Sequence, residues 1–305
     1  MFKKLALGTA QFGLDYGLSN TRGKIPRDEV ISILDYARKN SLAFLDTASI
    51  YGDSGAVIGE YLKSRPGQFQ VISKFASAEF VDEASIESQF RQSLETLKVN
   101  SLYGYLVHNF NNFLNLKKLW PTLEGLKQNG RVQKIGFSLY RPEELDQLLK
   151  TGLRFDILQI PFSVFDQRFK KYFAVLKERG VEIHARSVFL QGFYFLNPEE
   201  LKGNLKAYRK ALENLQHMAQ RRGVPLHALC LGFCLLQEEI GRVIIGVAGL
   251  GDLQKNFSVI ENIGRVKDVF STLETLKIDD ENLLLPYKWD TKESLMARGT
   301  EGVCR

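Results

Sequence analysis

Four polar residues, Asp46, Tyr51, Lys74 and His108, could together form a proton-transfer site. A tyrosine, with a pKa of about 10, is a poor acid at neutral pH unless its anion is stabilised. A lysine ammonium beside the phenol would provide that stabilisation, and an aspartate would hold the ammonium in place. A histidine could orient a substrate oxygen toward the phenol. The set would act as a general acid for an oxygen that gains negative charge, as a carbonyl oxygen does under hydride attack.

Each of these residues also has a simpler interpretation. Asp46 could cap a helix or form a salt bridge, Tyr51 could be a packed aromatic, and His108 could be structural. Lys74 could instead form a Schiff base, as in aldolases. The set has no Ser/His nucleophile–base pair and no flanking pair of carboxylates, which argues against glycosidase chemistry.

The four residues follow strand-like apolar segments. Short strands alternate with amphipathic helical stretches, a pattern typical of βα units and a parallel sheet. The predicted strands are Leu5–Gly8, Ala43–Leu45, Gln70–Ser73, Tyr103–Val107, Lys134–Ser138, Ile157–Ile160, Glu182–Ala185 and Val243–Ile245. The predicted helices cover residues 27–39, 54–64, 83–97, 116–128, 142–150, 168–179, 206–220 and 252–264.

This count predicts the α/β class and a (β/α)8 TIM barrel, in which the carboxyl ends of the strands carry the chemistry. A doubly wound open sheet is the competing architecture, but G-T-A-Q-F-G after the first strand lacks the expected glycine spacing. We expect a single domain over residues 1–305, with a C-terminal helix and tail from about residue 266. Residues 192–205 and 223–237 are predicted to be insertions around the seventh helix, and the polar tail from Lys292 to be mobile.

The composition indicates an ordinary globular protein. Its net charge is +6 and its pI is near 9.0, but the basic residues are scattered and not interleaved with aromatics, so we expect no nucleic-acid partner. Cys230 and Cys234 lie one helical turn apart in an apolar run and are predicted core residues. No apolar run could cross a bilayer and the N-terminus does not resemble a signal peptide, so the protein is expected to be cytoplasmic, with no membrane partner. The oligomeric state is not predicted.

The residues around the four candidates resemble the aldo-keto reductase family. The matching segments, in family order from residue 4 to about 265, are L-G-T-A-Q-F-G, F-L-D-T-A-S-I-Y-G-D-S, V-I-S-K-F, L-V-H-N-F, G-R-V-Q-K-I-G-F-S, L-Q-I-P-F-S, L-Q-G and I-I-G-V-A-G-L-G-D-L-Q-K-N-F. The resemblance implies that Tyr51 is the proton donor, that Lys74 and Asp46 tune it, and that His108 orients the carbonyl.

The resemblance also implies that a bound nicotinamide cofactor, without a metal, supplies the hydride to a small carbonyl substrate, possibly sugar-like, or removes it from an alcohol. The implied cofactor-binding residues are Gly8, Thr9, Ser138, Gln159, Arg186, Ser187, Leu190, Gly192, Gly246, Ala248, Asp252 and Asn256. A non-catalytic, cofactor-sensing subunit on the same barrel is the alternative function.

The sequence departs from the family pattern at several of these positions. Leu139 follows Ser138 where the family has asparagine, and Ser163 stands at another asparagine position. Arg186 replaces an aromatic that stacks on the nicotinamide; a guanidinium plane can stack on a ring, or the arginine could bind an acidic substrate group or the cofactor's pyrophosphate.

Two further positions bear on the choice between NADP and NAD. Ala248 and Asp252 occupy positions where branches of the family carry the arginine that binds the 2′-phosphate of NADP. An aspartate would repel that phosphate and could accept a hydrogen bond from a free ribose hydroxyl. Asp252 could equally be a simple helix cap. The cofactor is therefore expected to be NADP or NAD, with the choice open.

Overall fold

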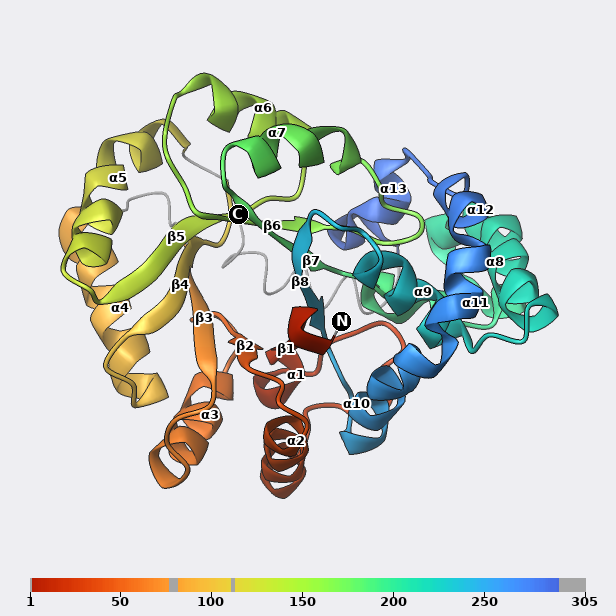
Figure 1. Cartoon of the computed structure of the whole chain (residues 1–305), viewed down its shortest axis with the longest axis horizontal. Helices are drawn as coiled ribbons and strands as arrows, with labels where there is room; N and C mark the ends of the chain where they lie inside the picture. Colours follow the sequence, from red (N-terminus) through yellow and green to blue (C-terminus); the bar gives the residue numbers. More distant parts are fainter. Residues whose placement is uncertain (1, 77–81, 111–112, 291–305) are drawn as a thin grey trace.

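The computed structural model describes residues 2–76, 82–110 and 113–290 as a closed barrel of parallel strands surrounded by helices (Figure 1). The strands neighbour one another in chain order, and β8 closes the barrel against β1. They are β1 (Leu5–Gly8), β2 (Phe44–Asp46), β3 (Gln70–Phe75), β4 (Leu102–Val107), β5 (Val132–Ser138), β6 (Ile157–Pro161), β7 (Glu182–Arg186) and β8 (Ile240–Ile245).

This arrangement confirms the predicted (β/α)8 fold, and each predicted strand overlaps an observed one. The pairing register places the strand ends at a common level: Gly8 lies opposite Asp46 in the β1–β2 pair, and Ser138 opposite Gln159 in the β5–β6 pair. The polar residues that end these strands therefore gather at one rim of the barrel, which we call the mouth.

The helices predicted over 27–39, 54–64, 83–97 and 142–150 have the observed bounds, and the other predicted helices are present with shifted ends. The helices are α1 (Ala10–Gly13), α2 (Arg27–Lys39), α3 (Ser54–Ser64), α4 (Glu83–Leu97), α5 (Phe113–Gln128), α6 (Pro142–Lys150), α7 (Phe173–Glu178), α8 (Arg209–Arg221), α9 (Leu226–Leu235), α10 (Leu250–Phe257), α11 (Ile263–Asp268), α12 (Phe270–Glu274) and α13 (Glu281–Leu284). The helix predicted over 252–264 is interrupted by a 3₁₀ segment, Ser258–Asn262, between α10 and α11.

The prediction for residues 223–237 was incomplete, because most of this segment is helix α9. Every residue of α9 from Ala228 to Leu235, including Cys230 and Cys234, is buried. A helix that is apolar on all sides shows no amphipathic period, and for that reason its pattern did not stand out in the sequence. The two cysteines are core residues, as predicted.

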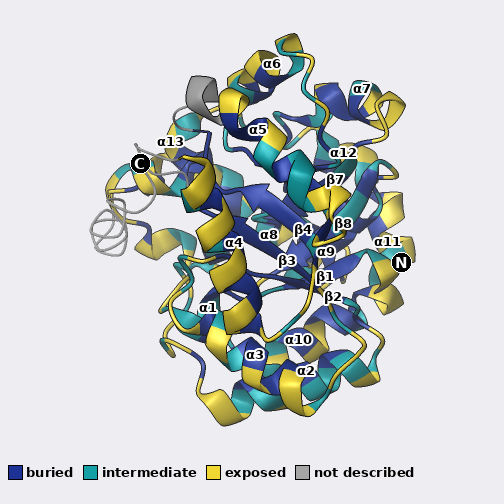
Figure 2. Cartoon of the chain, turned by 90° about the vertical axis from the view of Figure 1, so that its left-hand side faces the viewer, coloured by how far each residue is buried: buried dark blue, intermediate teal, exposed yellow. Residues whose placement is uncertain are grey.

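Two layers of apolar side chains hold the fold together. A small cluster inside the barrel comprises Ala6, Phe44, Ile72, Leu106, Ile157 and Ile244. A much larger cluster lies between the strands and the helices, whose outer surfaces are exposed (Figure 2). The inner cluster makes the barrel a packed core rather than a pore, so ligands have access only at its ends.

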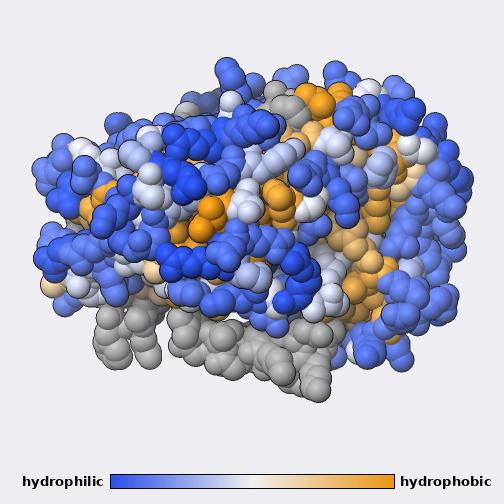
Figure 3. Space-filling model, turned by 90° about the horizontal axis from the view of Figure 1, so that it is seen from below, coloured by the Kyte–Doolittle hydropathy of each residue, from blue (hydrophilic) through white to orange (hydrophobic). Residues whose placement is uncertain are grey.

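The segment after β8 packs back on the barrel as far as it is described. Ile278 donates its backbone N–H to the carbonyl of Phe165, and the buried Trp289 donates its indole N–H to Leu283. The tail predicted from Lys292 lies outside the described residues. The face seen in Figure 3 is largely hydrophilic, with smaller apolar areas between. Among the residues described, no helix has the length and hydropathy needed to cross a membrane.

Candidate active site

The structure brings the four candidate residues together at the mouth. Asp46 ends β2, Lys74 lies one residue before the end of β3, and His108 directly follows β4. Tyr51 lies in the connection between β2 and α3. Because the strands are parallel and adjacent, their carboxyl ends point to the same rim, and the loop returns Tyr51 over it.

Lys74 and Asp46 form a buried ion pair. The Lys74 Nζ lies 2.7 Å from Oδ2 of Asp46 and also donates to the carbonyl of Thr47 at 3.0 Å. The lysine side chain is fully buried. Burial lowers the pKa of Lys74, the Asp46 carboxylate opposes this, and the nearby Arg186 cation lowers it further.

Tyr51 lies against both Lys74 and His108. The Lys74 Nζ is 5.3 Å from the centroid of the phenol ring, over its face, and the imidazole of His108 meets the ring edge-to-face at 5.8 Å. Burial and the Asp46 carboxylate raise the pKa of Tyr51 well above its usual value, while the Arg186 cation opposes the rise. The phenol is therefore protonated at neutral pH, the state that a proton donor requires.

His108 is neutral at physiological pH. Burial, followed by the Lys74 and Arg186 cations, lowers its pKa well below the usual value. Its buried Nδ1 has no hydrogen-bond partner among the residues that the structure describes. A neutral imidazole carries one N–H donor and one acceptor nitrogen, so His108 can donate a hydrogen bond to a substrate oxygen without a net charge.

Gln159 and Ser138 extend this network along the rim. The Gln159 side-chain amide donates to Oδ1 of Asp46 at 2.8 Å, and the Ser138 hydroxyl donates to Oε1 of Gln159 at 3.4 Å. Both carboxylate oxygens of Asp46 are thus engaged, one by Gln159 and the other by Lys74. This fixes the carboxylate and, through it, the lysine.

Gly8 and Thr9, two predicted cofactor contacts, lie where β1 meets β2. The Thr9 hydroxyl donates to the backbone carbonyl of Asp46 at 3.0 Å and accepts from Ser54 at 3.0 Å. Thr9 is fully buried, so its side chain holds the β1 and β2 ends together. Ser54 was missed in the sequence, because a serine that begins a helix ordinarily indicates capping.

The loop after β7 contains unusual backbone. Ser187, Leu190 and Gln191 have positive φ values of 58°, 46° and 51°, and such backbone clusters at ligand clamps. Gln191 ties this loop to the loop after β1, since its side chain donates to Tyr16 Oη at 2.9 Å and its carbonyl accepts from the Leu18 N–H.

Gly192 follows these residues and packs against the same loop. A Cβ at Gly192 would lie 2.0 Å from Oγ of Ser19, so only glycine fits this close approach. Leu190 is buried, and its side chain belongs to the core. Leu190 and Gly192 therefore contribute packing and backbone shape to this loop and no exposed side chain.

The β8 side of the mouth carries Gly246, Ala248, Asp252 and Asn256. Asp252 accepts the Ala248 N–H at 3.0 Å, so the aspartate closes the turn that begins α10. Asn256 is buried on the same helix. Asp252 is the third residue of α10, whose N-cap is Gly249, so it is not the N-cap but holds the turn that precedes the helix.

Arg22 and Glu29, both missed in the sequence, cover the same turn. Arg22 donates to both carboxylate oxygens of Glu29, at 3.0 and 2.6 Å, and to the carbonyl of Ala248. Glu29 in turn accepts the N–H of Leu250. Both residues lie more than two hundred positions before the β8 turn, so nothing in the sequence indicated that they contact it.

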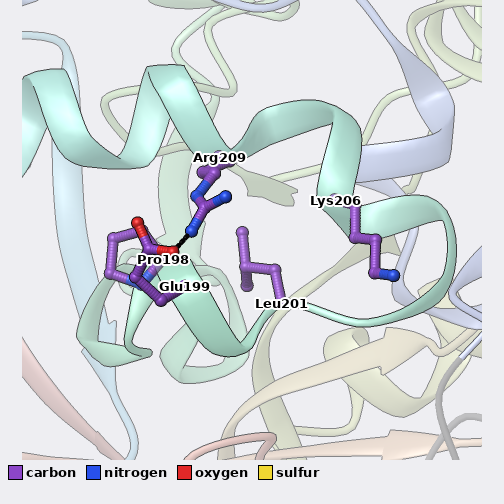
Figure 4. A pocket seen from close by; sticks show the side chains of 5 residues that line it. All are labelled: Pro198, Glu199, Leu201, Lys206 and Arg209. Carbon is purple, nitrogen blue, oxygen red and sulfur yellow. Dashed lines mark ion pairs between the residues drawn. The ribbon is translucent and has the colours of Figure 1, made fainter.

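A shallow pocket of about 250 Å³ lies elsewhere, beside the start of α8 (Figure 4). It is lined by Pro198, Glu199, Leu201, Lys206 and Arg209, and Figure 4 shows the Arg209 guanidinium directed at Glu199, with which it forms an ion pair. None of the candidate residues lines this pocket, so it does not belong to the site at the mouth.

This chain resembles known proteins of one family. The model of the aldo/keto reductase family matches residues 4–278, so the chain belongs to this family. It is 25% identical over 281 residues to the uncharacterized oxidoreductase YqkF of Bacillus subtilis, covering 83% of this chain and 90% of YqkF. It is 21% identical to L-galactose dehydrogenase of Arabidopsis thaliana, covering 88% and 90% of the two chains.

Solved structures agree on the fold. The holo form of aldo-keto reductase AKR11C1 from Bacillus halodurans matches with a TM-score of 0.71 at 21% identity, over 87% of this chain and 91% of that one. Family membership makes this protein an NAD(P)-dependent oxidoreductase that acts on small-molecule carbonyl compounds.

Proposed function

We propose that this aldo-keto reductase reduces an aldehyde or ketone to an alcohol, or runs the reverse oxidation, with Tyr51 as the proton donor. The observation that carries the proposal is the environment of Tyr51. Its phenol lies against a neutral histidine, which can orient a carbonyl oxygen, and a buried ammonium, which can stabilise the phenolate. A nicotinamide cofactor, when bound, supplies the hydride to the carbonyl carbon.

The residues of the chain then orient the carbonyl oxygen and protonate it as it gains negative charge. His108 donates a hydrogen bond that orients the oxygen toward Tyr51, and the Tyr51 hydroxyl gives up its proton as the oxygen becomes negative. The Lys74 ammonium and the Arg186 guanidinium stabilise the phenolate that remains. Asp46 holds Lys74 in place, and the reverse sequence applies to alcohol oxidation.

The residues at the β7 and β8 ends fit a nicotinamide dinucleotide. The positive-φ residues Ser187, Leu190 and Gln191 give this loop the character of a ligand clamp. Arg186 beside it is a half-buried cation suited to an anionic ligand. Gln159 and Ser138 would lie near a carboxamide at the rim, although the amide nitrogen of Gln159 also donates to Asp46.

For the choice of cofactor we infer a preference for NAD over NADP. The two backbone N–H groups beside the α10 turn, those of Ala248 and Leu250, already donate to Asp252 and Glu29. Arg22 is engaged by Glu29, and the three side chains carry two negative charges and one positive. A 2′-phosphate at this turn would meet net negative charge, and the N–H groups of Ala248 and Leu250 are already engaged.

Stopped-flow measurement of cofactor oxidation tests the proposed function. The protein is mixed with NADH or NADPH and then with a panel of aldehydes, ketones and sugars, and absorbance at the nicotinamide band is followed. We expect single-turnover oxidation of the cofactor with at least one aldehyde. Tight cofactor binding without oxidation by any member of the panel would instead support a cofactor-sensing subunit.

A further inference from the structure

We propose that the carbonyl substrate carries an acid group, a carboxylate or a phosphate, and that Arg186 binds this group at the mouth. This inference rests on the proposed function and names the substrate class for the same site. It starts from the unusual setting of Arg186 among the charged residues of the protein.

Arg186 is held in place by neutral partners. Its Nη2 donates to the carbonyl of Leu139 at 2.9 Å and its Nη1 to the hydroxyl of Ser187 at 3.2 Å. Its guanidinium lies 4.1 Å from the centroid of the Tyr140 ring, a cation–π contact. A guanidinium has five N–H donors, so these two hydrogen bonds leave donors for a ligand while the contacts fix the orientation of the group.

No carboxylate in the described part of the chain forms an ion pair with Arg186. Two other half-buried arginines are paired: Arg168 lies 2.8 Å from Asp166, and Arg141 lies 3.2 Å from Glu281. A partly desolvated cation without a counter-ion is costly unless a ligand supplies the negative charge.

The charges around the proton donor lead to the same conclusion. Asp46 contributes one negative charge, Lys74 and Arg186 contribute two positive charges, and His108 is neutral, so the group carries one net positive charge. Arg186 lies close enough to lower the pKa of Lys74 and of His108. An acid group on Arg186 would therefore lie a short distance from the reacting carbonyl.

Aromatic side chains surround this place. Tyr140 packs edge-to-face against Tyr287 at 6.4 Å, and both Tyr287 and Tyr16 are exposed. Exposed aromatics on the rim provide apolar surface for the carbon skeleton of a substrate, while Arg186 selects its charge. Together these residues favour a compact carbonyl compound with an acid group a few bonds from the carbonyl.

The experiment compares matched substrates that differ by the acid group. Succinic semialdehyde is set against butanal, and D-glyceraldehyde 3-phosphate against D-glyceraldehyde; the two pairs distinguish a carboxylate from a phosphate. In the natural protein we expect kcat/KM to favour the charged member of one pair. Arg186→Gln should lower that preference about 10- to 100-fold, the value of a lost hydrogen-bonded charge pair, whereas Arg186→Lys should retain part of it.

Arg141→Gln is the matched control, because it removes an equal charge from the same rim but from an arginine already paired with Glu281. We expect it to leave the charged-to-neutral ratio unchanged. If both variants lower the charged-to-neutral ratio equally, the preference comes from the overall positive charge of the rim, and the specific role of Arg186 is wrong. No preference for either charged substrate in the natural protein would overturn it as well.

Two binding measurements separate the remaining outcomes. If Arg186→Gln weakens NADH binding while the ratio is unchanged, Arg186 serves the cofactor and the inference is wrong. If no aldehyde is reduced at all, the proposed function fails, and calorimetric titration with unreactive succinate and with inorganic phosphate still decides the inference. Binding of either anion that is lost in Arg186→Gln supports the anion site, and binding of both that is absent or unaffected by the substitution refutes it.

Discussion

The two ends of the barrel hold nearly the same set of side chains in different states. At the mouth lie Asp46, Tyr51, Lys74, His108 and Arg186, which we call the mouth cluster. Near the amino ends of the strands lie Tyr103, Lys134, Glu182, His184 and Arg242, the floor cluster. Each cluster has one carboxylate, one tyrosine, one lysine, one histidine and one arginine.

In the floor cluster every other group is directed at the carboxylate of Glu182. Tyr103 and Lys134 approach one of its oxygens at 2.7 and 2.6 Å, and His184 and Arg242 the other at 3.3 and 3.6 Å. Burial opposes ionisation of Glu182, but the nearby His184 and hydrogen bonds from Lys134 and Tyr103 hold its pKa well below the usual range.

In the mouth cluster the same types of group are left available. Among the described residues, only Lys74 and Gln159 donate to the carboxylate of Asp46, and Arg186, Tyr51 and His108 have no hydrogen bond to a carboxylate. The comparison teaches that composition does not distinguish a structural cluster from a reactive one. The difference lies in which donors remain for a ligand.

The largest expected effect comes from the two tyrosines. Tyr51→Phe should lower kcat for carbonyl reduction about 10³-fold or more, since it removes the general acid, while NADH binding is retained. Tyr103→Phe makes the same chemical change in the floor cluster and should leave kcat within about twofold, because Tyr103 lies at the opposite end of the barrel. Steady-state kinetics on both variants measure this. An equal loss of kcat in Tyr103→Phe would contradict the distinction between the two clusters.

Substitution of the two lysines should lower the free energy of unfolding by different amounts. Lys74→Met leaves Asp46 charged and buried without its ion partner, a change that typically costs about 3–5 kcal/mol. Lys134 is 36% exposed, so Lys134→Met should cost less than about 1 kcal/mol. Urea unfolding of both variants at neutral pH checks this, and similar losses would show that the two ion pairs are equivalent.

We expect the two buried histidines to make the stability of the folded protein depend on pH. Burial lowers the pKa of both His108 and His184 in the folded protein, so the unfolded chain binds protons first as the pH falls below about 6.5. Stability is therefore fully present above that pH and is lost below it. The loss is at most about 1.4 kcal/mol per pH unit for each histidine.

The contribution of His108 should be the larger, because the Glu182 carboxylate partly offsets the lowering at His184. The urea unfolding midpoint is measured between pH 7.5 and 5.5. Its decrease with falling pH should be reduced more by His108→Gln than by His184→Gln. A steeper slope in either variant would contradict the assignment of neutral, buried imidazoles.

The smallest expected effect is at the α10 turn. Asp252→Asn removes one negative charge and should tighten NADPH binding relative to NADH binding about fivefold, as expected for one charge near the protein surface. Asp268→Asn on α11 is the control. Fluorescence titration measures both cofactors; tighter binding of NADPH than of NADH by the natural protein would refute the inferred preference.

Much of the fold and part of the candidate site could be predicted from the sequence. Strand periodicity placed Asp46, Lys74 and His108 at strand ends, and parallel strands then require a common rim. The stacking of Arg186 on Tyr140 could not be predicted, because it depends on how two loops from distant parts of the chain approach each other. Helix α9 was missed because its burial on all sides removes the amphipathic pattern.

The pH dependence of hydride transfer tests the role of Tyr51 most directly. Single-turnover rate constants for cofactor oxidation by a saturating aldehyde are measured from pH 6 to 9 in the natural protein. If Tyr51 donates the proton, its raised pKa keeps it protonated and the rate constant stays flat across this range. If the rate constant instead declines tenfold per pH unit across this range, the donor is the imidazolium of His108, whose pKa is lowered, and the account is contradicted.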